Sequence, residues 1–591
     1  MKKYLRYILP VCLAGSLCTS CTDFFETDSD GVLKTEGQRY QDETTARAGL
    51  FGLLQGLQRI GDNYVIMGEL RGDLMDVTEN SSQELRDISR FEVDAENSYL
   101  KEREYYSLIN NCNYYIHRLD TTISRREDDN SYPVKILRPY MAQAKTLRAW
   151  CYLQLCLDYG RVKYADEPFL DVSRPVEMQA LDLDGLLPVL IRDLEGVLPW
   201  MVSDDTPESS GWIRGNADPG FAGSVQYEGY TANQLMLPVR FVLGELYMWN
   251  QDFQKAAQTY YDLIYWNQLY VLSTYVNSYN ETTLLPAGKN WTSQFSGFSY
   301  YDILTAIPFT DEYTDNSSAL SKMFTTSYVL APSQALIDMF DEQSYSINTK
   351  PVTGDLRGIY GTYYDKEETV DGSETERPYV DKYNYMQKNE NAYVVLCRTA
   401  LVYLRYAEAV NRLGKPKLAF YGVLKYGLSK NTFEIYNDLL KDELTGEPWI
   451  DFGLTSSGDI GMFDVNSGLH GRGCGSQNLE LDPTFVIEAC ASSADTLLQV
   501  EDKLLTEYAL ETSLEGNRFH DLMRVARYRN DPSWLADKVA AKFPEGEREA
   551  IRAKLLNRQN WYLPQWNLER NESKRNVNRN TPFVGIYAPF R

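Results

Sequence analysis

Residues 243–264 have the sequence LGELYMWNQDFQKAAQTYYDLI, and the spacing of small and aromatic side chains in this stretch decides the fold. Ala256 follows Gly244 by twelve positions and Tyr260 follows it by sixteen. With a turn at residues 250–252, two antiparallel helices bring the two small residues together where the backbones touch, and the aromatic rings fill the space beside them. The stretch therefore predicts a tightly packed helical hairpin.

This spacing matches a tetratricopeptide repeat, in which such hairpins stack side by side. A second, weaker copy, LVYLRYAEAVNRLGKPKLAFYGVL, begins at Leu401 and has Gly414 and Pro416 at its turn. Other segments carry apolar residues at helical spacing, among them one from Val500 to about Val525. We predict a mostly α fold with tetratricopeptide-like hairpins as a scaffold, with helical segments over residues 42–60, 138–198, 233–268, 397–425 and 500–525.

Two segments lack helical patterning and are predicted to be loop-rich. Residues 270–393 are rich in Gly, Asn, Ser, Thr and Tyr, and a loop region of this length is usually functional. Residues 445–482 contain Gly471, Gly473 and Gly475, but without the strand, turn and helix of a dinucleotide site. We interpret the first segment as a large loop-rich insertion with a functional role and the second as turn-rich surface.

The N-terminus has the pattern of a secretory leader. Three basic residues within the first six precede an apolar run from Ile8 to Leu17, and Ser20 stands just before Cys21. About ten apolar residues are too few to span a bilayer, so the leader is expected to be removed and Cys21 to carry lipid; the alternative is ordinary secretion with a free or paired thiol. This divides the chain into a signal peptide at 1–20, a lipidated tether at 21–40 and a single domain at 41–591.

Composition excludes several classes of function. A formal charge of −24 and a pI of about 4.7 disfavour binding to nucleic acid, and beyond the leader no apolar run is long enough to span a membrane. The six cysteines after Cys21 form no CxxC pair and are expected to be free and buried, although a bridge from Cys474 to Cys490 remains open. The three histidines share no metal-ligand spacing, so neither a metal nor another cofactor is expected.

Several strings, in order along the chain, resemble the SusD/RagB outer-membrane lipoproteins of the Bacteroidetes. They are CTDFFETDSD from Cys21, GELRGDLMD at 68–76, QAKTLRAWCYLQLCLDYGRV from Gln143, LVYLRYAEAVNRLG from Leu401, LETSLEGNRFHDLMRV from Leu510 and YLPQW at 562–566. The last string lacks the family's proline-rich continuation.

The resemblance implies a scaffold of about four tetratricopeptide-like hairpins that carries a loop-rich, irregular ligand-binding half. It also implies a protein that sits on the cell surface as a lid on a SusC-like TonB-dependent transporter in the outer membrane. It would hand that transporter oligosaccharides, or sometimes peptides. The acidic residues after Cys21 are similar to the family's surface-export signal, although a solvated tether has the same composition. By analogy with the family, the loop after GELRGDLMD, with Asn80 and Gln83, would supply polar contacts to the ligand.

A sugar presents an apolar face of C–H groups and a rim of hydroxyls, so its binding surface needs aromatic rings beside polar donors. Five aromatic residues in irregular sequence are candidates for such contacts, and each has the alternative role of fixing its loop to the scaffold. They are Trp212, Trp291, Phe295, Tyr300 and Tyr301.

Charged residues near the two ends of the domain raise the question of catalysis or metal binding. Glu515, Arg518, Asp521 and Arg524 are spaced to form ion pairs along one helix. The acidic residues between Asp73 and Glu79 lack the pattern of an EF-hand. Without a GxSxG or HExxH motif, we predict a binding protein and not an enzyme. A secreted glycoside hydrolase and a purely structural scaffold are the alternatives.

Overall fold

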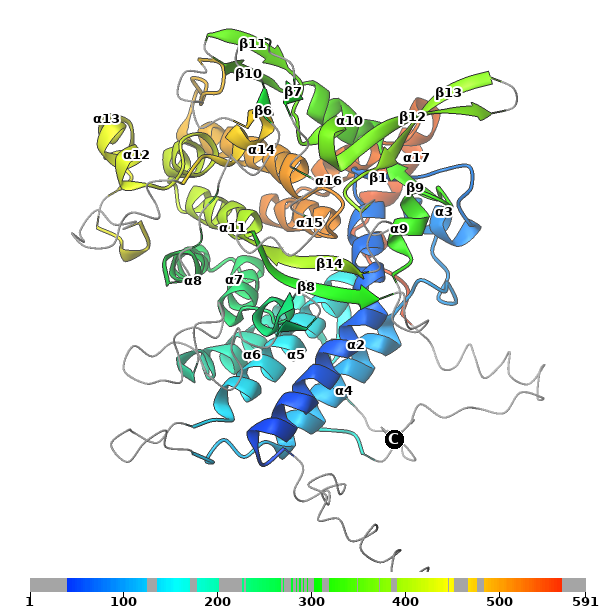
Figure 1. The fold of residues 1–591 in the computed structure, drawn as a ribbon, viewed down its shortest axis with the longest axis vertical. Coiled ribbons are helices and arrows are strands. Elements are labelled where there is room, and N and C mark those ends of the chain that lie inside the picture. The colour runs from blue at the N-terminus through cyan, green and yellow to red at the C-terminus, as the bar shows by residue number, and fades with distance from the viewer. Residues whose placement is uncertain are drawn as a thin grey trace, which may run out of the picture.

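Helices dominate the computed structural model of the chain (Figure 1). It describes residues 40–124, 135–170, 178–200, 226–227, 230–266, 269, 271, 278–279, 283, 286–287, 291, 295, 302–310, 318–347, 349–370, 373–383, 391–444, 446–450, 466–475 and 483–565.

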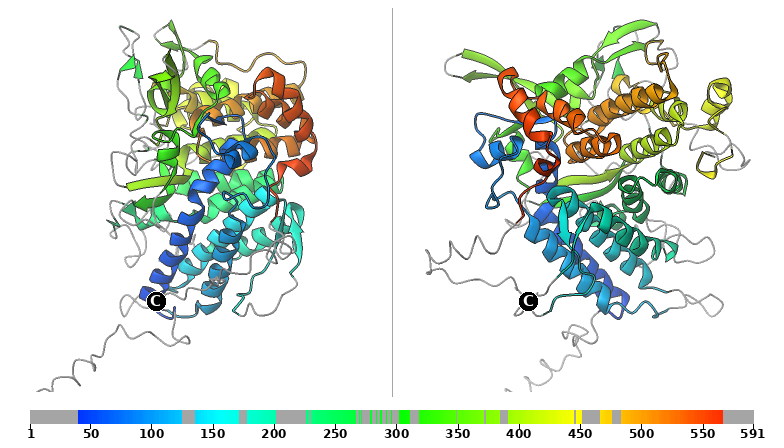
Figure 2. Two further views of the ribbon diagram at one scale, coloured as in Figure 1. Left: turned by 90° about the vertical axis from the view of Figure 1, so that its right-hand side faces the viewer. Right: turned by 180° about the vertical axis from the view of Figure 1, so that it is seen from behind.

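Most long helices pack against the helix that follows them in the chain, and this produces the stacked scaffold expected from the repeats. In the last part of the chain, α15 also packs against α2, so the end of the domain returns to its beginning. Figure 2 shows α15 to α17, in orange and red, on the side away from the viewer of Figure 1. The helices are α2 (Glu43–Leu70), α4 (Glu102–Arg118), α5 (Arg138–Tyr159), α6 (Leu183–Glu195), α7 (Val239–Trp249), α8 (Phe253–Trp266), α11 (Thr399–Arg412), α14 (Ser493–Thr512), α15 (Arg518–Arg529), α16 (Pro532–Ala540) and α17 (Glu545–Leu555).

The hairpin of α7 and α8 confirms the predicted packing. A Cβ atom on Gly244 would lie only 2.6 Å from the ring of Tyr260, and Ala256 is fully buried. The second copy also forms a hairpin, of α11 with a π-helix, η9 (Leu418–Lys425), and its turn contains Gly414 with a φ of +80°.

The helices differ from the sequence prediction in three ways. Helix α2 continues past residue 60 to Leu70. Gly61 and Gly68 do not end the helix; they lie inside it, where Phe309 and the backbone of Gly516 come close. The single helix predicted over 500–525 is two helices, α14 and α15, separated by a turn in which Gly516 has a φ of +94°. Helices α4, α16 and α17 were not predicted from the sequence.

The segment predicted to be loop-rich contains regular structure from Ile303 to Val380. Its strands form antiparallel pairs, and β8 pairs with β14 alongside α2, where Phe309 lies against Gly61. The strand pairs that bear on the site are β1 (Met75–Val77) with β9 (Leu330–Pro332), β2 (Arg161–Lys163) with β3 (Ala180–Asp182), β8 (Ile303–Thr310) with β14 (Asn391–Arg398), and β12 (Tyr363–Val370) with β13 (Ser373–Val380).

Short elements complete the described part of the chain. They are α3 (Gln83–Ser89), α9 (Leu320–Phe324), α10 (Gln334–Asp341), α12 (Lys430–Ile435), α13 (Asn437–Leu440), the 3₁₀ helices η2 (Leu198–Trp200), η3 (Ala232–Leu235), η10 (Pro448–Ile450), η12 (Leu469–Cys474) and η14 (Arg558–Trp561), the π-helix η7 (Gly358–Thr362), and the pairs β4 (Gln226–Tyr227) with β5 (Tyr230–Thr231), β6 (Ser278–Tyr279) with β7 (Pro286–Ala287) and β10 (Ser344–Ile347) with β11 (Lys350–Thr353).

A buried ion network lies around Glu511 near the end of α14. Arg357, Arg398 and Arg472 each place a guanidinium nitrogen 2.7 Å from its carboxylate. Burial alone would raise the pKa of Glu511, but the three guanidinium groups outweigh it and hold that pKa well below its usual range. Charged pairs of this kind tie irregular segments of the chain to the helical scaffold.

Arg472 belongs to the glycine-rich stretch that the sequence predicted to be surface, and this prediction is wrong for residues 466–474, which are buried. The glycines are needed there because neighbours approach closely: a Cβ atom on Gly473 would lie 1.9 Å from the hydroxyl of Tyr345. Cys474 is a buried free thiol and Cys490 is also free, so the two do not form a bridge.

Candidate functional site

The predicted aromatic contacts fall into two groups in the structure. Trp212, Tyr300 and Tyr301 lie outside the described residues, as does the predicted lipidation site Cys21. Trp291 and Phe295 are described, and their side chains are 0% and 3% exposed.

Trp291 and Phe295 pack against each other and against the central ion network. The Nζ atom of Lys382 lies 4.8 Å from the Phe295 ring centre, and the indole N–H of Trp291 donates to Thr362 over 3.3 Å. Gly361 lies against the other side of the indole, where a Cβ atom would clash. Neither ring presents a face to a ligand, so their role in this structure is packing, which was the alternative considered for each.

Asn80 and Gln83 are exposed; Asn80 lies in the loop between β1 and α3, which is firmly held, and Gln83 is the first residue of α3. The hydroxyls of Thr78 and Ser81 donate to the backbone carbonyls of Tyr328 and Val329, next to β9. Arg86 donates to the carbonyls of Thr78 and Glu79 over 2.9 Å. The scaffold therefore fixes the position of the loop, and the Asn80 side chain is exposed to solvent.

A stack of three tyrosines lies next to this loop. Tyr364 and Tyr379 are directly paired across β12 and β13, with ring centres 5.6 Å apart, and Tyr379 stacks on Tyr328 at 4.3 Å. Tyr328 and Tyr379 are buried, whereas the outer ring, Tyr364, is half-buried. The stack thus ends in one partly exposed aromatic face.

Charged side chains surround the stack in pairs. Arg377 of β13 forms an ion pair with Glu79 of the loop, and its guanidinium lies 5.6 Å from the Tyr328 ring centre. Lys366 pairs with Glu368, and its Nζ lies 4.9 Å from the ring centre of Tyr379. We call these residues the tyrosine surface: Glu79, Asn80, Gln83, Tyr328, Tyr364, Lys366, Glu368, Arg377 and Tyr379.

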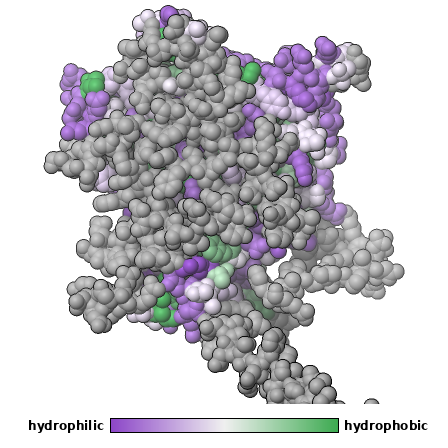
Figure 3. Space-filling model, in the orientation of Figure 1, coloured by the Kyte–Doolittle hydropathy of each residue, from purple (hydrophilic) through white to green (hydrophobic). Residues whose placement is uncertain are grey.

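The outer end of the β12–β13 hairpin is strongly hydrophilic, as the purple region in the upper right of Figure 3 shows. Burial and the hydrogen bond to Glu368 raise the pKa of Tyr379 above its usual value, so its hydroxyl stays protonated at neutral pH. The surface as a whole combines a ring face, amides and neutralised charges, which suits an uncharged polar ligand.

The charged residues first considered for catalysis are structural. Arg518 forms an ion pair with Asp73, at 2.6 Å, and Glu515 binds Lys382 and Arg398 of the ion network. Only Arg524 and Asp521 form the expected pair along α15, at 2.9 Å. The expectation of ion pairing holds, but most partners come from other elements.

The acidic residues after α2 are likewise engaged with cations. Asp73 pairs with Arg518, and Glu79 pairs with Arg377. The described residues contain no group of three or more Asp, Glu, His or Cys side chains arranged to hold a metal ion.

The three stacked tyrosines were missed by the sequence analysis. Tyr328 begins a short apolar run that was noticed, but nothing in the local pattern places it beside residues 364 and 379. Residues 373–380, SETERPYV, do not alternate between polar and apolar side chains, so the local pattern gave no indication of this strand.

No family model and no curated protein sequence matches this chain. Solved structures do match it. A SusD superfamily protein from Bacteroides vulgatus is 13% identical, with a TM-score of 0.56 over 87% of this chain and 93% of that one. A SusD-like carbohydrate binding protein from Bacteroides fragilis is 14% identical, with a TM-score of 0.51 over 84% and 88%.

Surface glycan-binding protein A from Bacteroides fluxus is also similar, at 16% identity and a TM-score of 0.51 over 86% of this chain and 94% of that one. The chain therefore has the fold of the SusD superfamily, as the ordered sequence strings predicted.

Proposed function

We propose that this chain is a cell-surface protein that binds an oligosaccharide or polysaccharide and delivers it to a partner SusC-like TonB-dependent transporter in the outer membrane. The observation that carries the proposal is the tyrosine surface, built on a fold shared with proteins described as carbohydrate- or glycan-binding.

The tyrosine surface offers the two kinds of contact that a sugar needs. The partly exposed ring of Tyr364 is a platform for the C–H face of a pyranose. The amides of Asn80 and Gln83 and the guanidinium of Arg377 are donors for its hydroxyls. Because Tyr364 is backed by two further rings, it is held in position before the ligand arrives. Trp212, Tyr300 and Tyr301 remain proposed additional contacts.

Attachment to the membrane is proposed to come from lipid on Cys21. None of the helices among the described residues combines the length and apolar content that crossing a bilayer requires. The several acyl chains of a bacterial lipoprotein bind firmly, at about 0.8 kcal/mol per buried methylene. The acidic residues that follow Cys21 would then lie in a tether between the lipid and the domain.

The tyrosine surface is proposed to bind without catalysis. A glycosidase needs one carboxyl group with a raised pKa to act as the acid. At this surface, the hydrogen bonds from Lys366 and Tyr379 instead lower the pKa of Glu368, and Glu79 is paired with Arg377. Glu368 is therefore a poor proton donor at neutral pH.

The test is calorimetry of the purified mature chain against soluble neutral glycans. Tyr364→Ala should weaken the binding of any glycan that the wild type binds by about tenfold, the equivalent of about 1.4 kcal/mol. Tyr265→Ala is the matched control, because Tyr265 is half-buried and stacks on Tyr261 at the same 5.6 Å. Binding of oligopeptides and no glycan would reassign the ligand class, and release of sugar products would make the protein an enzyme.

A further inference from the structure

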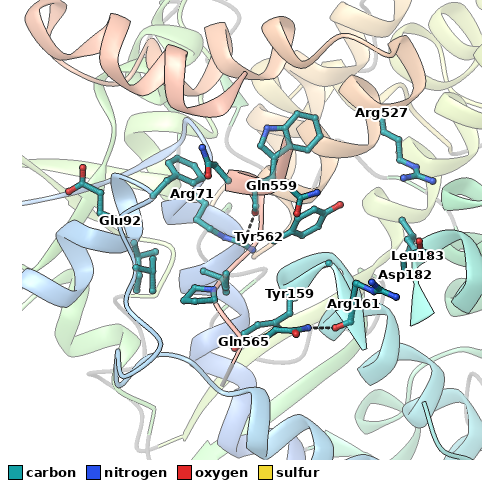
Figure 4. A pocket seen from close by; sticks show the side chains of 18 of the residues that line it. Arg71, Glu92, Tyr159, Arg161, Asp182, Leu183, Arg527, Gln559, Tyr562 and Gln565 are labelled. Carbon is teal, nitrogen blue, oxygen red and sulfur yellow. Dashed lines mark hydrogen bonds between the residues drawn. The ribbon is translucent and has the colours of Figure 1, made fainter. Parts of the chain in front are cut away.

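A groove with a volume of about 800 Å³ lies on the part of the molecule where the C-terminal end of the domain crosses the ends of several helices (Figure 4). This volume is in the range of about 300–1,000 Å³ that is typical of small-molecule sites. Its walls come from the residues after α3, the end of α5, the start of α6, the end of α15 and residues 559–565.

The segment 559–565 is fixed in the groove by hydrogen bonds to buried groups. Arg71, itself 1% exposed, donates to the carbonyl of Trp561 over 3.2 Å, and the amide of Leu563 donates to the carbonyl of Asp158 over 2.8 Å. Gln565 donates to the carbonyl of Arg161. The groove is therefore a formed feature of the fold.

The walls of the groove present apolar surface that is only half-buried. Four apolar or aromatic side chains of intermediate burial line it: Phe91, Val93, Tyr562 and Pro564. The ring of Tyr562 rests on Gly160, where a Cβ atom would lie 2.9 Å away, and Gly160 has a φ of +76°. This contact fixes the orientation of the Tyr562 ring.

Charged side chains at the rim of the groove lie opposite side chains of the other sign. Arg527 pairs with Asp184, and Glu92 pairs with Lys554 at 2.8 Å. Arg161 and Asp182 are directly opposite each other across β2 and β3. A charged ligand would therefore have to compete with an existing partner, whereas a neutral one would not.

Uncharged hydrogen-bonding groups also line the groove. The side chains of Gln559, Asn560 and Gln565 are exposed at its rim, and their amides both donate and accept. Aromatic walls and amide-rich rims suit a ligand with C–H faces and many hydroxyls.

We propose that this groove is a second binding site for a neutral oligosaccharide. The ligand class rests on the proposed function, but the residues are separate from the tyrosine surface. Gln83 of that surface begins α3 and Ile88 of the groove lies near its end, so this single helix of seven residues separates the two sites. At about 1.5 Å per residue, the five positions from Gln83 to Ile88 correspond to about 7.5 Å along the helix axis.

The experiment measures stoichiometry by calorimetry of the full mature chain with hexaoses of glucose, xylose and mannose. For the sugar that binds, the wild type should bind two molecules per chain. The double variant Gln559→Ala, Arg161→Ala, which changes two exposed rim side chains, should bind one. Tyr364→Ala should reduce binding only at the other site. Gln334→Ala, an exposed glutamine on α10, should leave both sites unchanged.

A measurement without mutations checks the same proposal. In hydrogen exchange of the wild type, the saturating hexaose should protect backbone amides in residues 559–565 and 91–93 in addition to those of β12 and β13. Two sites that survive the rim variant, or protection at the hairpin alone, would overturn the groove proposal and leave the proposed function standing. Failure of every hexaose at both places would overturn both, and groove protection by oligopeptides alone would overturn the saccharide assignment.

Discussion

Gly68 and Gly516 are in backbone contact: a Cβ atom on Gly68 would lie 1.8 Å from the carbonyl oxygen of Gly516. The next residue, Glu69, accepts hydrogen bonds from the amides of Gly516 and Asn517, at 2.7 and 3.1 Å, just before α15. Two of the strings that identified the fold from the sequence, GELRGDLMD and LEGNRFHDLMRV, therefore meet in space as one structural unit.

Gly68→Ala should strongly destabilise the protein, because the added methyl group meets backbone that cannot move aside. Overpacking typically costs about 1–3 kcal/mol, and a backbone neighbour places this variant at the upper end. Gly546→Ala is the control, because that glycine lies in α17 with nothing within 4 Å of its Cβ position. It should be neutral or stabilising by up to about 1 kcal/mol. Urea unfolding of both variants is the measurement; equal midpoints would contradict the contact.

Glu69 should make stability depend on pH. Burial raises the pKa of its carboxyl from 4.5 to about 7, and its Oε2 atom has no hydrogen-bond partner among the described residues. The folded state therefore keeps this proton to a higher pH than the unfolded state does. The stability it contributes is full below about pH 4.5 and is lost as the pH rises to about 7.

Glu69→Gln should remove this dependence. Relative to the wild type, the variant should gain about 3 kcal/mol in free energy of unfolding between pH 4.5 and 7. Glu549→Gln, at an exposed position of α17, is the control. Urea midpoints measured across this range decide the matter, and parallel curves for wild type and Glu69→Gln would count against the prediction.

Arg398→Met should be among the most damaging single changes. The Arg398 side chain is fully buried and binds Glu511, Glu515 and Asp302, so its removal leaves carboxylates buried without compensation. The expected loss is about 3–5 kcal/mol in urea unfolding. Lys441→Ala breaks an exposed pair with Asp438 and should cost less than about 1 kcal/mol. A mild effect of Arg398→Met would show that the ion network contributes little to the free energy of unfolding.

Cys21→Ser should release the protein from the membrane without changing the folded domain. Lipid on Cys21 is the proposed anchor, and serine at this position cannot accept the thioether-linked lipid. Fractionation of cells that express each form, with mass spectrometry of the mature N-terminus, is the measurement. Membrane retention of the serine variant would contradict the proposed anchor.

Much of the scaffold could be predicted from the sequence because small residues mark close helix contacts. The α7–α8 hairpin was predicted in this way from the spacing of Gly244 and Ala256. The first predicted helix ended at residue 60, just before Gly61, but Gly61 lies inside the longer α2, in contact with Phe309 of β8. Helix α4 was missed because Asn110, Asn111 and Asn113 are poor helix formers, and tertiary contacts of Asn113 compensate for them.

The candidate site was harder to predict, because its parts come together only in three dimensions. Asn80 was expected from its place after a recognisable string, and its loop is indeed exposed. Trp291 was expected to face a ligand from its irregular surroundings, yet its ring is buried against Gly361. Tyr364 and Tyr379 are paired within the β12–β13 hairpin, and Tyr328 joins them because the region of β9 packs against β13, a contact that local sequence does not reveal.

The junction of α2 with the start of α15 also has a consequence for biogenesis. Glu69 accepts a hydrogen bond from the amide of Gly516, 447 residues further along the chain. In the proposed export route, the centre of the domain therefore cannot close until nearly all of the polypeptide has crossed the inner membrane. Passage through a narrow channel requires an unfolded chain. A domain whose centre needs residues near 516 would stay unfolded until translocation is almost finished.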